Sequence, residues 1–188
     1  MIAKRYLCFA ACLKFAAEEA FAIQVDQVAV ANGLGVILPD GYNPAELTAF
    51  GITNLRFDRD ANLFGIIPGI AKINAILASA SLECKYESIV FFQDWEFEDR
   101  LVELTGSGQF PIVGFEYRSL FGGEAPEHQG HCVLVRNVLR RTRQRPEASI
   151  YDPGPDRAGI SNVDMESLYY ACRKKRAGIW TLSRLSTG

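Results

Sequence analysis

The stretch Cys8-Phe-Ala-Ala-Cys12-Leu places a cysteine where an apolar helix begins. Apolar residues recur at helical spacing over 7–22, which predicts a mostly buried helix. The first turn of a helix carries N–H groups without intrahelical partners and the positive end of the helix dipole, and both stabilise a thiolate. Cys8 is therefore a candidate nucleophile.

The composition is that of an ordinary globular protein. The chain has 188 residues, of which 48% are hydrophobic, so we expect residues 1–188 to form one domain with a sizeable core. The formal net charge of -2 gives no general attraction to nucleic acid, and no nucleic-acid partner is expected. No window holds the ~18 apolar residues of a membrane span.

The cysteines and the N-terminus indicate a cytoplasmic protein. The five cysteines form no CxxC pair and no regular framework, which favours reduced thiols over disulfides or a zinc site. Lys4, Arg5 and the apolar run 7–13 loosely imitate a signal peptide. Lys14 and Glu18 interrupt that run, so the expected location is the cytoplasm.

Predicted helices dominate the first half of the chain, and predicted strands dominate the second. The helices cover 7–22, 25–32, 43–51, 70–80, 94–105 with Asp94 as N-cap, and a late segment from Ser161 or Asn162 through 171. The strands cover 36–38, 84–89, 110–117, 131–139, 148–151 and 179–185. This order predicts an α+β fold.

A nucleophilic cysteine needs a base, and the chain offers two histidines, His128 and His131. The strands 131–139 and 148–151 flank an arginine-rich turn and form a candidate hairpin. A turn centred between residues 141 and 142 places His131 directly opposite Asp152, with both side chains on one face. Cysteine, histidine and aspartate in that chain order form a candidate triad, in which the carboxylate orients the imidazole.

Three motifs resemble those of papain-like cysteine peptidases, most closely the C39 and C39-like family. The family has a cysteine opening a helix, a Gly-His-x-Val-Val-Val strand and a strand ending in Asp-Pro. This chain has Cys8-Phe-Ala-Ala-Cys12-Leu, Gly130-His-Cys-Val-Leu-Val135 and Tyr151-Asp-Pro-Gly154. The resemblance covers nearly the whole chain. It implies a papain-like fold, with an N-terminal helical half packed on an antiparallel sheet from the C-terminal half.

The resemblance also implies a function. It makes Cys8 the nucleophile, His131 the general base and acid, and Asp152 the residue that orients the imidazole. The implied reaction is hydrolysis of a peptide or amide through a thioester intermediate, with no cofactor and no metal. An acyltransferase that uses the same triad and the same thioester intermediate is the alternative enzyme.

The sequence departs from the family pattern at two positions. Family members place a glutamine that stabilises the oxyanion six residues before the cysteine, and here that position is Ile2. Glycine usually follows the cysteine, and here Phe9 does. Loss of one oxyanion donor typically slows catalysis ~100- to 1000-fold. A catalytically inactive binding module is therefore the alternative from a different class.

The remaining chemistry-bearing residues have structural interpretations. Cys12, Cys84 and Cys172 are expected in the core, as is Cys132, which alternates with His131 and should face the other side of its strand. A metal site formed by His128 and His131 with Glu127 and Cys132 is disfavoured, because residues three apart on a strand face opposite sides. The arginines at the hairpin tip are expected to be a solvated loop rather than a grip for RNA or an acidic partner.

Overall fold

The computed structural model describes residues 4–61, 64–123, 130–155 and 157–185. The first half contains α1 (Cys8–Phe21), α2 (Gln27–Leu34), β1 (Val36–Leu38), α3 (Ala45–Ala49), β2 (Leu55–Phe57), α4 (Ile70–Leu77) with a 3-10 turn (Ala78–Ala80), and β3 (Leu82–Ser88). The second half contains α5 (Asp94–Gly106), β4 (Ile112–Glu116), α6 (Tyr117–Phe121), β5 (Gly130–Leu139), β6 (Glu147–Asp152), β7 (Gly159–Asp164), α7 (Met165–Lys174) and β8 (Gly178–Arg184).

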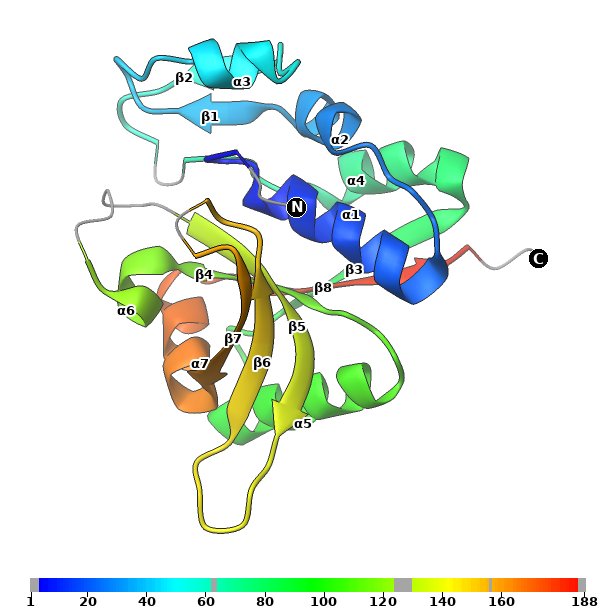
Figure 1. Cartoon of the computed structure of the whole chain (residues 1–188), viewed down its shortest axis with the longest axis vertical. Helices are drawn as coiled ribbons and strands as arrows, with labels where there is room; N and C mark the ends of the chain where they lie inside the picture. The colour runs from blue at the N-terminus through cyan, green and yellow to red at the C-terminus, as the bar shows by residue number, and fades with distance from the viewer. Residues whose placement is uncertain (1–3, 62–63, 124–129, 156, 186–188) are drawn as a thin grey trace.

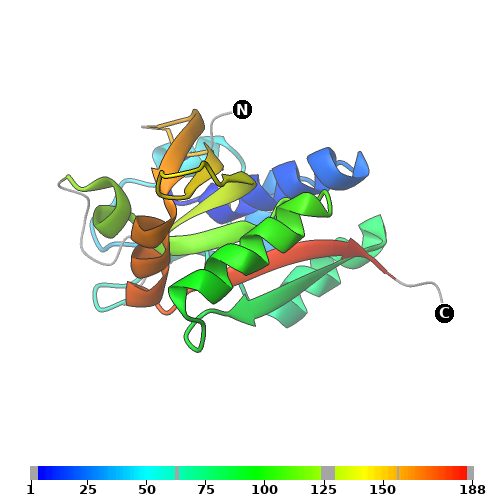
Figure 2. The ribbon, with the colours of Figure 1, turned by 90° about the horizontal axis from the view of Figure 1, so that it is seen from below.

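Six strands form one antiparallel sheet in the order β3-β8-β4-β5-β6-β7. Helix α1 packs against one face of this sheet, and α5 and α7 pack against the other (Figure 1, Figure 2). Strands β1 and β2 form a separate parallel pair beside the N-terminal helices. The predicted α+β architecture, with a helical N-terminal half on an antiparallel sheet, is confirmed.

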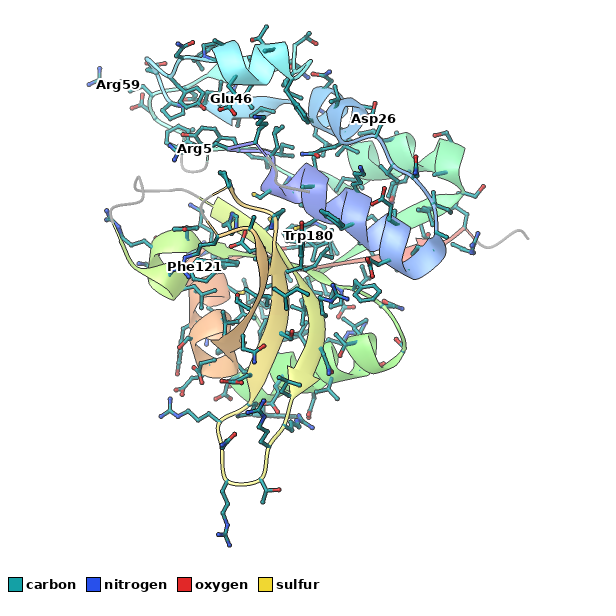
Figure 3. The ribbon with its side chains drawn as sticks, viewed as in Figure 1. Arg5, Asp26, Glu46, Arg59, Phe121 and Trp180 are labelled. Carbon is teal, nitrogen blue, oxygen red and sulfur yellow. The ribbon has the colours of Figure 1, made fainter. Side chains whose placement is uncertain are left out.

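Alternation along β5 divides the core into two clusters. Leu134 points into the cluster around α1, and Val133 and Val135 point into the cluster around α5 and α7. The side chain of Trp180 joins α1 to the sheet, because its ring centroid lies 5.5 Å from that of Phe9 at an interplanar angle of 71° (Figure 3). The start of α1 is thus fixed against β8, a strand far from it in the sequence.

Two predicted helix starts are wrong. Residues 161–164 belong to β7, where Ser161 pairs with Ile150, and Asp164 caps α7 by accepting a hydrogen bond from the Ser167 backbone N–H at 2.8 Å. The pairing with β6 overrides the local capping signal of residues 161 and 162. Helix α5 is capped by Gln93 instead of Asp94, in a capping box with Glu96.

The predicted hairpin register is also wrong. Leu134 pairs with Tyr151 and Val135 with Ile150, a shift of two residues from the predicted pairing. A bulge then follows between Val135 and Asn137. The turn contains Arg143 in the left-handed region at φ 66°, so its centre lies further along the chain than predicted. A shift of two residues preserves the face to which each side chain points.

Candidate active site

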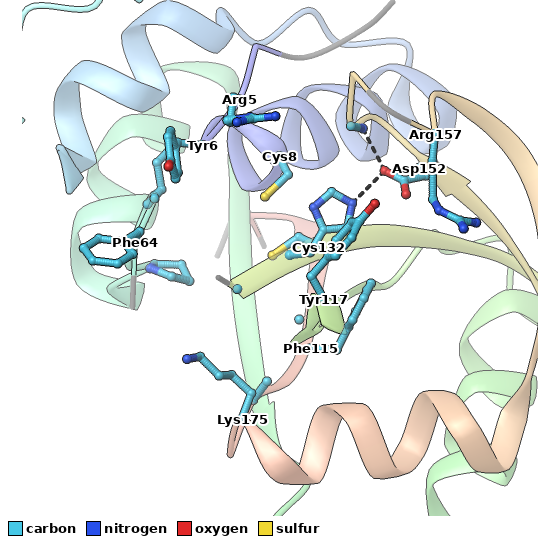
Figure 4. Close-up of a pocket in the computed structure, with 18 of the residues that line it drawn as sticks. Arg5, Tyr6, Cys8, Phe64, Phe115, Tyr117, Cys132, Asp152, Arg157 and Lys175 are labelled. Carbon is cyan, nitrogen blue, oxygen red and sulfur yellow. Dashed lines mark hydrogen bonds and ion pairs between the residues drawn. The ribbon is translucent and has the colours of Figure 1, made fainter. Parts of the chain in front are cut away.

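Cys8 is the first residue of α1 and is half-buried. The residue before it, Leu7, provides no side-chain hydrogen bond to cap the helix. No side-chain oxygen of Leu7 therefore accepts a hydrogen bond from the first N–H groups of α1, and the positive end of the helix dipole lies beside the thiol. Cys8 lines a cavity of about 90 Å³ together with His131 and Asp152 (Figure 4).

His131 and Asp152 form a direct hydrogen bond in the buried part of this cavity. The distance between His131 Nε2 and Asp152 Oδ1 is 2.6 Å, and the side chains are 6% and 1% exposed. A carboxylate can only accept, so Nε2 carries the proton and donates it. This bond leaves the other ring nitrogen, Nδ1, available to a partner on the opposite edge of the imidazole.

The loop after β6 holds the Asp152 carboxylate in place. The backbone N–H of Gly154 donates to the same Oδ1 at 2.7 Å. A Cβ at residue 154 would lie 2.9 Å from this oxygen and 3.0 Å from Cε1 of His131. Only glycine allows the backbone to approach both side chains this closely, which gives Gly154 of the Asp-Pro-Gly sequence a structural role.

Aromatic side chains fix the orientation of the imidazole. The ring centroids of Phe115, Tyr117 and Phe121 lie 5.5, 5.3 and 6.5 Å from that of His131, all in edge-to-face arrangements. Such contacts each stabilise a ring pair by about 0.5–1.5 kcal/mol beyond burial. The imidazole is therefore constrained by packing as well as by Asp152.

The electrostatics favour a charged thiolate and imidazolium. Hydrogen bonding from the side chain of Cys132 lowers the pKa of the Cys8 thiol, burial opposes this, and His131 lowers the pKa further. Burial disfavours the charged form of His131, but Asp152 and Cys8 outweigh it and raise the pKa of His131 to about 10. Proximity to an opposite charge stabilises both ionised forms.

Cys132 is a residue of the site that sequence reasoning missed. It is half-buried and packs against the core cluster around α1, as predicted, but it also lines the same cavity as Cys8. Its side chain does lie on the α1 face of β5, opposite Val133, as alternation requires. Sequence alternation could show which face it occupies, but not that the start of α1 docks there.

The other cysteines are confirmed as core residues. Cys12, Cys84 and Cys172 are buried. Burial raises the pKa of Cys12 and Cys172, and raises that of Cys84 to about 12. These thiols stay protonated near neutral pH, in contrast to Cys8.

Two residues of the disfavoured metal site fall outside the part of the chain that the structure describes. Glu127 and His128 lie outside the described residues, as does Ile2. Within the described residues, no group of three or more His, Cys, Asp or Glu side chains could hold a metal ion. In the same part of the chain, no helix is both long and apolar enough to cross a membrane.

Comparisons with known proteins support the fold assignment. No protein-family model and no curated protein match the sequence. Among solved structures, the chain is similar to a putative C39-like peptidase from Bacillus anthracis, with a TM-score of 0.57 and 16% sequence identity. The match covers 96% of this chain and 90% of that one. The protein therefore has the fold of a C39-like peptidase, as its sequence motifs predict.

Proposed function

We propose that the protein is a papain-like thiol hydrolase that cleaves a peptide or amide bond with Cys8, His131 and Asp152. The observation that carries the proposal is the His131–Asp152 hydrogen bond in the cavity that Cys8 lines. The nucleophile, base and orienting group come from α1, β5 and β6. Their convergence from distant parts of the chain favours one site over three independent structural roles. We also propose that residues 1–188 form one domain, because both core clusters share a single sheet.

The proposed mechanism has two halves. The Cys8 thiolate attacks the carbonyl carbon, and the His131 imidazolium gives its Nδ1 proton to the leaving amine, which forms a thioester. Water then attacks the thioester carbonyl while Nδ1 accepts a proton from it. The C–S bond breaks, which regenerates the Cys8 thiolate and releases the acid product. Throughout, Asp152 accepts a hydrogen bond from the protonated Nε2 and so keeps Nδ1 directed toward the reacting atoms.

The helix start supplies a candidate oxyanion donor. The backbone N–H of Cys8 lies in the first turn of α1, where the dipole stabilises negative charge. Phe9, which replaces the usual glycine, is 1% exposed and packs against Trp180. Its side chain therefore belongs to the core, and the departure at Phe9 leaves the cavity beside Cys8 open.

An acyl-transfer assay tests the proposal without knowledge of the natural substrate. The protein is mixed with p-nitrophenyl acetate, and the modified residue is identified by mass spectrometry. The proposal predicts acetylation of Cys8 and its loss by hydrolysis, with Cys8→Ala as the control for acetylation elsewhere. Faster loss to an added amine than to water would favour an acyltransferase. No acetylation of Cys8 above that of Cys12 would support an inactive binding module.

A further inference from the structure

The cavity beside Cys8 is bordered by basic side chains. Its described lining residues include four lysines and arginines: Lys4, Arg5, Arg157 and Lys175. Asp152 is the one carboxylate among the same residues, and His131 already holds it at 2.6 Å. The cavity wall therefore has an excess of positive charge in a protein whose formal net charge is -2. Composition alone gives no indication of this local excess.

The four basic side chains differ in how their charge is compensated. Lys4 Nζ lies 2.6 Å from Glu46 Oε1, so its charge is balanced outside the cavity. Lys175 lies near Glu116, whose nearest cation is Lys174 at 2.7 Å. Arg157 forms no ion pair with any carboxylate of the described residues. Its charge is therefore not balanced by a carboxylate of the described residues.

Arg157 is connected to the site by an aromatic contact. Its guanidinium carbon lies 4.5 Å from the centre of the Phe121 ring, and that ring contacts His131 edge to face. Arg157 also follows the Gly154–Pro155 turn, which packs on Asp152 (Figure 4). This turn fixes the position of the Arg157 backbone beside the site. A guanidinium stacked on a ring keeps its N–H edges available for two parallel hydrogen bonds to a carboxylate.

The rest of the cavity wall is apolar. Phe64, Ile66, Pro68 and Trp180 are among its described lining residues. A substrate that fills this cavity would place hydrocarbon against these residues and an anionic group toward Arg157. Charges of one sign lining a partly buried cleft concentrate ligands of the opposite sign.

We propose that Arg157 is a specificity-determining residue that binds a carboxylate of the substrate, so that the enzyme acts on acidic peptides or amides. This inference rests on the proposed function, because it assigns the substrate class of the same site. The carboxylate comes either from an acidic side chain or from the C-terminus of a peptide. Both sources present the same planar anion to the guanidinium.

A pair of alkylating reagents tests the charge preference directly. Iodoacetate and iodoacetamide deliver nearly the same group to a thiolate, but only iodoacetate is anionic. Arg157→Gln is expected to slow alkylation of Cys8 by iodoacetate about three- to tenfold, and Arg157→Lys to restore most of the rate. The rate with iodoacetamide should stay within about twofold.

Arg141→Gln is the matched control. Arg141 is exposed in the β5–β6 turn, whose tip lies at the far end of the molecule from α1 (Figure 1), so this change removes one positive charge without touching the cavity. It should leave both rates unchanged. Equal slowing of both reagents by Arg157→Gln would show a structural effect, and no slowing of iodoacetate would show that Arg157 does not attract anions. Either result would overturn the proposal.

A binding measurement separates this proposal from the proposed function. If Cys8 reacts with neither reagent, the catalytic assignment fails, and anion binding is then measured in Cys8→Ala protein by the NMR signal of the Trp180 indole. The probes are N-acetylglutamate 1-amide, N-acetylglutamine and neutral N-acetylglutaminamide. Tighter binding of the first indicates an acidic side chain, and tighter binding of the second a C-terminus. Equal affinity for all three would overturn the inference.

Discussion

His131 Nε2 lies 2.6 Å from Asp152 Oδ1, although the two residues do not occupy opposed positions in the β5–β6 ladder. The register that pairs Leu134 with Tyr151 brings Asp152 level with Val133, so the histidine reaches the carboxylate diagonally. Diagonal neighbours on one face of a sheet lie within reach of long or aromatic side chains. The contact therefore depends on the shared face of the two strands. The predicted pairing was wrong by two residues, but it still placed both side chains on the same face.

Asp152→Asn should lower the pKa of His131. Burial disfavours the imidazolium, and the Asp152 hydrogen bond and charge together with Cys8 raise the His131 pKa to about 10. Loss of the negative charge should lower that pKa by about one pH unit or more. NMR titration of the His131 ring measures it, and Cys8→Ala, which leaves Asp152 in place, gives the contribution of the thiolate separately.

The raised pKa of His131 also predicts how the stability of the fold depends on pH. A histidine whose pKa is raised in the folded state stabilises that state by binding a proton more tightly there. The full stabilisation is present below the unfolded pKa of about 6.5, and it is lost as pH rises toward about 10. The difference in unfolding free energy between wild type and Asp152→Asn should therefore shrink over this pH range. A difference that is constant from about pH 6 to about pH 10 would mean that His131 gains no proton affinity from Asp152.

Cys132→Ala should raise the pKa of Cys8. The side chain of Cys132 is the largest single influence that lowers this pKa, because it donates a hydrogen bond to the thiolate. Alkylation of Cys8 near pH 6 should become slower, and its rate near pH 10 should change little. Cys84→Ala is the control, because Cys84 is buried on β3 and does not line the cavity. Equal effects of the two substitutions would show that Cys132 acts only through general stability.

Two arginines at the hairpin tip should differ in their contribution to stability. Arg140 Nε lies 2.5 Å from Glu98 Oε1, and the same guanidinium also pairs with Asp99, so it ties the hairpin to α5. Arg141 is exposed and outside these pairs. Because exposed ion pairs stabilise little, Arg140→Ser should lower the unfolding free energy by about 1 kcal/mol at most, and Arg141→Ser by less than about 0.5 kcal/mol. Denaturant titration in low and high salt checks this, and loss of the difference in high salt is expected.

Phe9→Ala should destabilise the fold strongly. Phe9 is 1% exposed and packs against Trp180, so truncation leaves a cavity where α1 meets β8 and should lower the unfolding free energy by about 3–5 kcal/mol. Phe91→Ala removes the same atoms from a side chain that is 86% exposed, and should change stability by less than about 0.5 kcal/mol. Similar losses for both would contradict the assignment of Phe9 to the core.

The parts of the fold that follow from local pattern could be predicted from the sequence. The apolar period over 7–22 predicts α1, and alternation about a polar turn predicts the β5–β6 hairpin. The exact register could not be predicted, because it depends on a bulge after Val135 and on the left-handed conformation of Arg143. Arg143 is neither a glycine nor an asparagine, so its residue type gives no signal for the left-handed conformation.

The candidate site shows the same division. Cys8, His131 and Asp152 could be named from motif order, and the His131–Asp152 contact follows from strand pairing. Cys132 and Arg157 could not be named, because their positions depend on how α1 and the loop after β6 dock on the sheet. Such long-range contacts leave no periodic pattern in either segment.

The pH dependence of Cys8 alkylation tests the central claim most directly. Iodoacetamide is reacted with wild type and with Cys8→Ala over a range of pH, and modification at each cysteine is measured by mass spectrometry. A thiolate paired with the His131 imidazolium should react already near pH 6, with a second change in rate as His131 loses its proton near pH 10. Reaction that rises only through about pH 8.5, as for an unperturbed thiol, or labelling near pH 6 that persists in Cys8→Ala, would contradict the account.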